Sequence, residues 1–215
     1  MKISIPKEII PELPVAEFFG DIYVIDSVSK TNMAINALQK ETMVGFDSET
    51  KPSFTRGKNN KVALIQISTF TDCFLFRINK MGMPLKLKEF LQNEAIKKIG
   101  LSLNNDILAM QRLTDISPKG FIDLQKLVSD YNIIDMSLQR IYAIIFDKKI
   151  SKAQRLTNWE AMTLTPAQQR YAALDAFACL EIYDWLSRGN FIPEESQYIV
   201  NEEEEETGSN ETEKI

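Results

Sequence analysis

The chain has 215 residues, 44% of them apolar, which is enough to bury one sizeable core and predicts a single domain. It contains no histidine, which excludes Ser-His-Asp and Cys-His triads, imidazole bases and histidine-ligated zinc, so any chemistry must use carboxylates, hydroxyls, lysines or metals. The net charge of −5 is uneven: residues 194–215 hold nine acids and one base, so residues 1–193 carry +3, a balance compatible with a nucleic-acid partner without indicating one.

The first 20 residues are interrupted by three prolines and are expected to form an N-terminal extension on the surface of one domain, which spans residues 21–190. They lack the continuous apolar region of a signal peptide, and no apolar run is long enough to span a membrane. The two cysteines, Cys73 and Cys179, lie in separate apolar runs and are expected to be reduced core residues. A soluble, cytoplasmic protein without a membrane partner is therefore predicted.

Four strands and one helix are expected in the first part of the domain. A strand over residues 21–27 precedes a helix near residues 29–40, and three strands follow at residues 44–49, 62–68 and 73–77. Short connections join these three strands, so an antiparallel meander is predicted.

Strands and helices alternate in the second part of the domain. Strands near residues 97–101 and 120–123 follow helices near residues 85–93 and 104–113, and further helices extend to about residue 146. Such alternation is typical of parallel pairing, so the whole sheet is expected to be mixed.

The last helix begins at the clearest helix signal in the sequence. Thr165 is in the N-cap position, Pro166 in the first helical position, and Gln168 where a capping box requires it. From residue 171 to residue 186 the helix is apolar nearly all round, so it is expected to be largely buried. Residues 191–215 lose this periodicity, include five consecutive glutamates, and are expected to be an acidic, disordered tail.

Asp47 and Glu49 are two acids in a run that is otherwise mostly apolar or small. Their spacing puts both carboxylates on one face of an extended strand. A partly buried carboxylate must be protonated, hydrogen-bonded, paired or bound to a cation, whereas an edge strand that faces solvent needs none of these. Both interpretations are open for the pair alone.

Two further acids occupy unusual places. Asp106 lies in the first turn of a predicted helix, where an acid can simply complement the helix dipole, and Asp175 interrupts the apolar last helix, where a salt bridge to a lysine is an alternative. Together with Asp47 and Glu49, these acids favour a carboxylate site for hard divalent cations such as Mg²⁺ or Mn²⁺. Tyr171 precedes Asp175 by one helical turn on the same face, so it is either a core residue or holds a water molecule near the cations.

Three motifs in this sequence resemble those of a known family. The runs FDSET around Asp47, GLSLNND ending at Asp106 and YAALD from Tyr171 to Asp175 are similar to the three exonuclease motifs of the DEDDy class of 3′–5′ exonucleases, which includes ribonuclease D and the Werner-syndrome exonuclease domain. The resemblance covers about residues 21–188, includes the runs RGK, VALIQIS and RLTNWE, and is closer to the Werner type. The combination of motifs is highly specific, whereas each motif alone is weak.

The resemblance implies a ribonuclease-H-like α/β fold, with a mixed five-stranded sheet flanked by helices. It also implies that two divalent cations, Mg²⁺ or Mn²⁺, are bound by Asp47, Glu49, Asp106 and Asp175, and that Tyr171 orients the attacking water. Two cations about 3.5–4 Å apart can activate water and stabilise the departing 3′ oxygen of an in-line displacement. The expected activity is hydrolysis from the 3′ end to nucleoside 5′-monophosphates, with DNA favoured over RNA.

The loop after the strand with Asp47 holds the expected substrate-binding residues. Arg56, Lys58 and Lys61 are candidates for contacts with backbone phosphates, and Phe54 for stacking on a base or wedging the last pair. The alternative is a solvated loop in which Phe54 only covers the core. In the run RLTNWE, by contrast, Arg155 and Trp159 are expected to pack and anchor helices rather than to contact substrate.

The expected partner is nucleic acid, either a single strand or the 3′ end of a duplex. Only an acidic tail follows residue 189, where ribonuclease D has helical nucleic-acid-binding domains, so action alone or recruitment by a protein such as a helicase is expected. Three alternatives are a catalytically silent adaptor on the same fold, a 3′–5′ exoribonuclease, and a phosphatase that acts on free nucleotides. The oligomeric state is left open.

Overall fold

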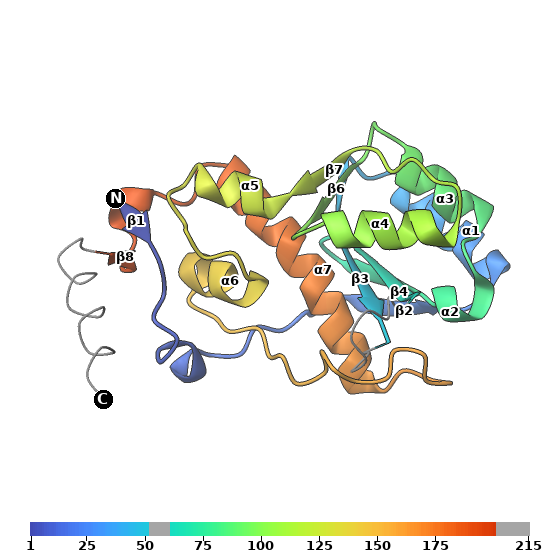
Figure 1. The fold of residues 1–215 in the computed structure, drawn as a ribbon, viewed down its shortest axis with the longest axis horizontal. Coiled ribbons are helices and arrows are strands. Elements are labelled where there is room, and N and C mark those ends of the chain that lie inside the picture. Colours follow the sequence, from blue (N-terminus) through green and yellow to red (C-terminus); the bar gives the residue numbers. More distant parts are fainter. Residues whose placement is uncertain (52–60, 201–215) are drawn as a thin grey trace, which may run out of the picture.

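The computed structural model describes residues 1–51 and 61–200 and contains a mixed sheet with helices on both faces (Figure 1). Within these residues the main sheet has six strands in the order β2-β5-β4-β3-β6-β7. The strands are β2 (Asp21–Ile25), β3 (Met43–Thr50), β4 (Val62–Ser68), β5 (Asp72–Phe76), β6 (Lys97–Gly100) and β7 (Phe121–Asp123).

The pairing of the strands follows the predicted pattern. β3, β4 and β5 form the antiparallel meander, while β6 and β7 pair in parallel beside β3 and β2 pairs in parallel with β5. The expected mixed sheet flanked by helices is confirmed. The described sheet has six strands, whereas the family resemblance implied five, because strands are added in parallel at both edges of the meander.

The helices divide into two sets, one on each face of the sheet (Figure 1). One face is covered by α1 (Val28–Leu38), α2 (Ile78–Met81), α3 (Leu85–Gln92) and α4 (Asn104–Leu113). The other is covered by α7 (Pro166–Ser187), with α5 (Leu124–Ser129) and α6 (Leu138–Phe146) packed outside it. Each set encloses its own apolar core against the sheet, and Cys73 and Cys179 are buried, free cysteines in the α7 core.

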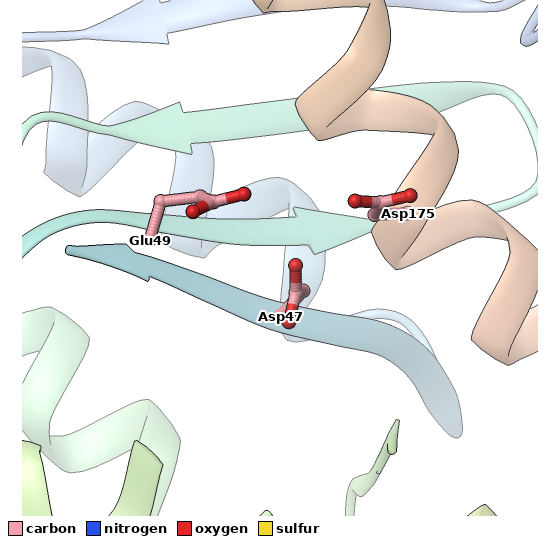
Figure 2. Close-up of side chains that lie close together, drawn as sticks. All are labelled: Asp47, Glu49 and Asp175. Carbon is pink, nitrogen blue, oxygen red and sulfur yellow. The ribbon is translucent and has the colours of Figure 1, made fainter. Parts of the chain in front are cut away.

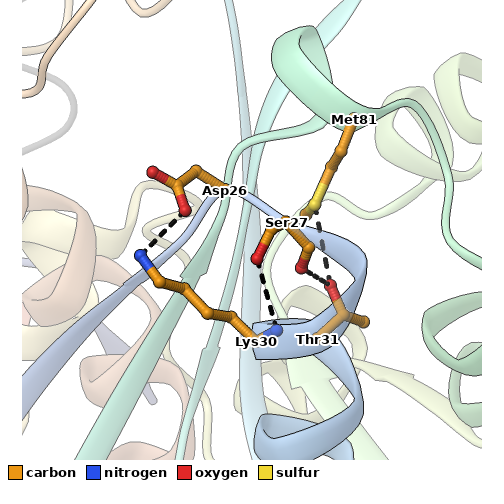
Figure 3. Close-up of polar contacts among 5 residues, drawn as sticks. All are labelled: Asp26, Ser27, Lys30, Thr31 and Met81. Carbon is orange, nitrogen blue, oxygen red and sulfur yellow. Dashed lines mark hydrogen bonds and ion pairs between the residues drawn. The ribbon is translucent and has the colours of Figure 1, made fainter.

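Polar side chains hold the start of α1, on the face away from α7 (Figure 3). The Ser27 hydroxyl accepts a hydrogen bond from the backbone N–H of Lys30 at 3.4 Å, and the Lys30 ammonium pairs with Asp26 at 2.9 Å. The Thr31 hydroxyl donates to the Ser27 carbonyl at 3.0 Å and lies 3.6 Å from the sulfur of Met81 in α2. These contacts tie α1 to the end of β2 and to α2.

The capping signals predicted for α7 are all present. The Thr165 hydroxyl accepts from the backbone N–H of Gln168 at 3.2 Å, and the Gln168 side chain accepts from the backbone N–H of Thr165 at 3.0 Å. Most residues from Ala172 to Leu186 are buried, as the apolar pattern predicted. The helix therefore runs as one long element across the sheet (Figure 1).

α7 lies unusually close to β3, and a glycine makes this possible. A Cβ added at Gly45 would lie 1.9 Å from the carbonyl oxygen of Ala176. A side chain at this position would push the helix away, so glycine is needed for the contact. Since Ala176 follows Asp175, the same contact brings Asp175 over β3.

The two ends of the described chain meet far from the sheet (Figure 1). β1 (Lys2–Ile3) pairs in antiparallel fashion with β8 (Ile199–Val200), and the short helices η1 (Ile10–Glu12) and η2 (Pro193–Glu195) lie in the flanking segments. The expected tail thus begins with residues that have structure as far as Val200, and Tyr198 is buried. The rest of the expected tail, residues 201–215, lies outside the described residues. In the described part of the chain no helix is both long and apolar enough to cross a membrane.

Candidate active site

Three carboxylates converge at the contact between β3 and α7 (Figure 2). The strand alternates, so that Gly45, Asp47 and Glu49 share the face that α7 covers, and Asp175 projects from the helix toward them. One oxygen from each of Asp47, Glu49 and Asp175 lies within 4.8 Å of the others. The predicted common face of Asp47 and Glu49 is therefore present, and both side chains are half-buried rather than open to solvent as in an edge strand.

The three acids strongly perturb one another. Burial, followed by repulsion from Asp175 and the other acids, raises the pKa of Asp47 well above its usual value. Burial and the charges of Asp175 and Asp106 raise the pKa of Glu49 to about 8, and burial raises the pKa of Asp175 to about 7. The fully ionised set is thus disfavoured without a positive charge, and oxygen donors in this arrangement suit a hard divalent cation.

Asp106 lies beside this cluster rather than in it. It sits in the first turn of α4, and its carboxylate accepts a hydrogen bond from the hydroxyl of Ser48, which points to the opposite face of β3 from Asp47 and Glu49. Burial raises the pKa of Asp106, and its charge in turn raises the pKa of both Asp47 and Glu49. Of the four predicted ligands, the structure brings three together and holds the fourth nearby through Ser48.

Tyr171 faces Asp175 across one turn of α7. The phenol is half-buried, and burial, followed by repulsion from Asp175 and Glu49, raises its pKa above the usual value. Its ring packs against the fully buried Trp159, with ring centroids 6.0 Å apart at 32°. The phenol therefore keeps its proton at neutral pH and can donate a hydrogen bond, while Trp159 has the packing role expected of it.

Two exposed basic side chains, Lys152 and Arg155, lie near the carboxylates. Both belong to the segment before α7, residues 151–164, which we call the rim segment. The charge of Arg155 lowers the pKa of Glu49, and that of Lys152 lowers the pKa of Asp175. Arg155 was expected to pack between helices, but it is exposed and faces the site, and Lys152 was not predicted as a site residue. Their position in a basic stretch that leads directly into the helix of Tyr171 and Asp175 is the sequence signal that could have indicated both.

The rim segment is attached to the body by side chains that bond its backbone. The buried guanidinium of Arg77 donates to the carbonyl of Ala161, and the amide of Asn79 donates to the carbonyl of Glu160 at 3.4 Å. From α7, the amide of Gln168 donates to the carbonyl of Asn158 at 3.3 Å. These hydrogen bonds, together with buried Trp159, hold the rim segment in place, so that the side chains of Lys152 and Arg155 lie near the site.

Most of the predicted substrate-binding residues cannot be placed. Phe54, Arg56 and Lys58 lie outside the described residues. Lys61 is exposed just before β4. At the other end of this connection, Lys51 forms an ion pair with Glu160 of the rim segment at 3.4 Å. The loop thus leaves β3 next to the rim segment.

Comparisons with known proteins show a family and a fold that this chain shares. A family model described as a 3′–5′ exonuclease matches residues 22–189. The mouse bifunctional 3′–5′ exonuclease/ATP-dependent helicase WRN is 32% identical over 215 residues, which cover 95% of this chain and only 15% of that protein. Two solved structures are also similar to the chain. The EXO domain of Nibbler from Aedes aegypti has a TM-score of 0.73 at 25% identity and covers 84% of this chain and 97% of its own. RNase D from Escherichia coli, with a TM-score of 0.70 at 22% identity over 77% of this chain and 44% of its own, shows a common fold.

Proposed function

The chain belongs to the 3′–5′ exonuclease family of phosphodiester hydrolases, and from this premise we propose that it removes nucleotides from the 3′ end of nucleic acid with the help of divalent cations. The observation that carries the proposal is the convergence of half-buried Asp47 and Glu49 with buried Asp175, whose carboxylate oxygens lie within 4.8 Å of one another. The expected product of each step is a nucleoside 5′-monophosphate.

The donor set fits the cations that the family resemblance implies. Among the described residues, the ligand atoms that converge at the site are carboxylate oxygens, and burial disfavours their ionised forms unless a cation compensates them. Two divalent cations, Mg²⁺ or Mn²⁺, would supply activation of a water molecule and stabilisation of charge on the scissile phosphate and the departing 3′ oxygen. Asp106, held beside the cluster by Ser48, is the proposed fourth ligand of a DEDDy site.

Tyr171 is proposed to orient the attacking water by a hydrogen bond. Its raised pKa keeps the phenol protonated at neutral pH, so it does not act as the base that removes the proton from water. Packing against Trp159 limits the motion of the ring, and the neighbouring Asp175 keeps the phenol close to the carboxylates.

Lys152 and Arg155 are proposed to bind backbone phosphates on one side of the site. Exposed cations beside a metal site suit phosphate, which fixes the position of a strand without reading its sequence. The loop residues Phe54, Arg56, Lys58 and Lys61 are also proposed to contact the substrate. Arg155→Gln should weaken binding equally for all sequences and reduce the slope of log affinity against log salt by about one unit.

DNA is the proposed substrate in preference to RNA, because the sequence motifs are closer to the Werner type. RNA is the alternative, and the similarity to Escherichia coli RNase D, an exoribonuclease, supports it. The name of the mouse relative includes a helicase, and a helicase is accordingly the kind of recruiting partner that we propose. Two buried, free cysteines fit the proposed cytoplasmic location.

The test is cleavage of matched 5′-labelled DNA and RNA oligonucleotides with Mg²⁺ or Mn²⁺. A ladder that shortens from the 3′ end is expected for the wild type and is expected to vanish in Asp175→Asn. The control is Asp184→Asn on the same helix, where the acid pairs with exposed Arg188 and lies away from the site. Retention of oligonucleotide without shortening would instead identify an adaptor, and release of phosphate from free nucleotides alone would identify a phosphatase.

A further inference from the structure

Gln66, in the middle of β4, is a fully buried residue whose side chain has no hydrogen-bond partner. Both the Oε1 and the Nε2 atoms of its amide are unpaired among the described residues. Buried polar groups are almost always paired, and an exception calls for an explanation such as a catalytic role or a missing ligand. The amide of Gln66 is therefore available to a partner that the present arrangement of side chains does not supply.

The register of the sheet places Gln66 beside Asp47. The two residues are direct partners in the antiparallel pair of β3 and β4, so their side chains lie on the same face. The Cβ atoms of such partners are about 4.5–5.5 Å apart, which is within the reach of a glutamine side chain. This is also the face that α7 covers, so Gln66 is close to the carboxylate cluster but shielded from solvent.

Asp47 has no side-chain hydrogen bond or ion pair among the described residues. Asp106, by contrast, accepts a hydrogen bond from Ser48, and Asp175 faces the phenol of Tyr171. Within the described part of the chain Glu49 is not paired directly, but the charge of Arg155 lowers its pKa. The hydrogen bond that Asp47 does receive comes from the backbone of Ser48. Carboxylates that bind metals are usually also hydrogen-bonded by a second group, which orients them.

We propose that Gln66 is the positioning residue of Asp47, with its Nε2 donating a hydrogen bond to the carboxylate when Asp47 binds a divalent cation. This inference rests on the proposed function, because it requires a cation at the cluster. Gln66 is fully buried, so it acts through Asp47 and does not touch the substrate. The hydrogen bond holds the carboxylate in the orientation that the cation needs and gives the unpaired amide its partner.

The test replaces the amide of Gln66 by an apolar group while keeping the volume of the side chain similar. In Gln66→Met, the affinity for Mn²⁺, measured by titration calorimetry without nucleic acid, is expected to fall by about 10–100-fold, the usual effect of losing such a partner. The free energy of unfolding of the metal-free variant should be unchanged or higher, because an unpaired buried amide has been removed. The matched control is Leu64→Met, a similar change at the buried strand partner of Glu49, which should leave Mn²⁺ affinity within about twofold of the wild type.

A double-mutant cycle shows whether the effect passes through Asp47. Gln66→Met should weaken residual Mn²⁺ binding much less in an Asp47→Asn background, and equal losses in both backgrounds would overturn the inference. Wild-type Mn²⁺ affinity in Gln66→Met, or in Gln66→Leu if the first variant folds poorly, would overturn it as well. If the wild type itself binds no Mn²⁺, both the cation site of the proposed function and this inference fail. If the wild type binds Mn²⁺ and Gln66→Met binds it equally well, only this inference fails.

Discussion

Adding one methyl group at Gly45 should move Asp175 on α7 away from Asp47 and Glu49 on β3. In Gly45→Ala, the new Cβ would lie 1.9 Å from the carbonyl oxygen of Ala176 and 2.7 Å from its carbon, whereas ordinary contacts begin at 3.4 Å. Both neighbours are backbone atoms, so no side chain can rotate away. The helix must therefore retreat from β3 by roughly 1.5 Å, which is the difference between 3.4 and 1.9 Å, and it carries Asp175 with it.

The expected loss of activity is large compared with the expected loss of stability. Displacement of a catalytic group by about 1 Å can reduce the rate of a reaction about 100-fold, so the rate of single-turnover cleavage should fall by at least that factor. Overpacking of this kind typically costs about 1–3 kcal/mol in the free energy of unfolding. Affinity for Mn²⁺ should fall as well, because Asp175 no longer lies within reach of Asp47 and Glu49.

The assay combines single-turnover cleavage of a 5′-labelled oligonucleotide, Mn²⁺ titration and urea unfolding. The control is Gly189→Ala, just after α7, where φ is +71° and no atom lies within 4 Å of the added Cβ. Backbone strain there should cost about 1–2 kcal/mol without moving Asp175. A folded Gly45→Ala protein with wild-type rate and Mn²⁺ affinity would refute the idea that the close approach of α7 assembles the site.

Three further outcomes are expected. Burial raises the pKa of both Glu49 and Asp175, and the charges of Asp175 and Asp106 raise that of Glu49 further, so between about pH 4 and pH 8 the folded metal-free protein binds more protons than the unfolded chain. Its free energy of unfolding should therefore fall as pH rises through this range, and Mn²⁺ should flatten the decline. Urea unfolding that shows stability rising with pH in the absence of Mn²⁺ would contradict this. The rate of cleavage should rise with pH to a plateau, and Tyr171→Phe should lower this plateau by about 100-fold without moving the midpoint of the rise. Exchange of Mg²⁺ for Mn²⁺ should instead move the midpoint to lower pH. A midpoint that shifts only in Tyr171→Phe would mean that the phenol is the base. Removal of residues 201–215, which hold seven acids and one base, should tighten binding of nucleic acid at low salt and matter little at high salt, where the Debye length falls below the roughly 8 Å of physiological conditions. Weaker binding by the truncated protein would mean that these residues contribute to the binding surface.

The sequence by itself determined the features that depend on neighbours along the chain. The spacing of Asp47 and Glu49 put them on one face, because side chains alternate along any strand. The capping residues before α7 marked its start, and its apolar character predicted burial, because these signals act within a few residues. The motifs around Asp47, Asp106 and Asp175 identified the family and predicted the site residues, although not what each of them touches.

Only the tertiary structure decided which side chains meet. The distance between Asp175 and Asp47 depends on the contact of Ala176 with Gly45, and the proximity of Gln66 to Asp47 depends on the register of two strands. The same holds for the contact of Asp106 with Ser48 and for the pairing of β1 with β8, which gives structure to residues expected to belong to the tail. The exposure of Arg155 toward Glu49 likewise follows from the attachment of the rim segment to the body. Each of these contacts joins residues far apart in sequence. Its geometry is set by strand register and helix packing, which local sequence patterns do not specify.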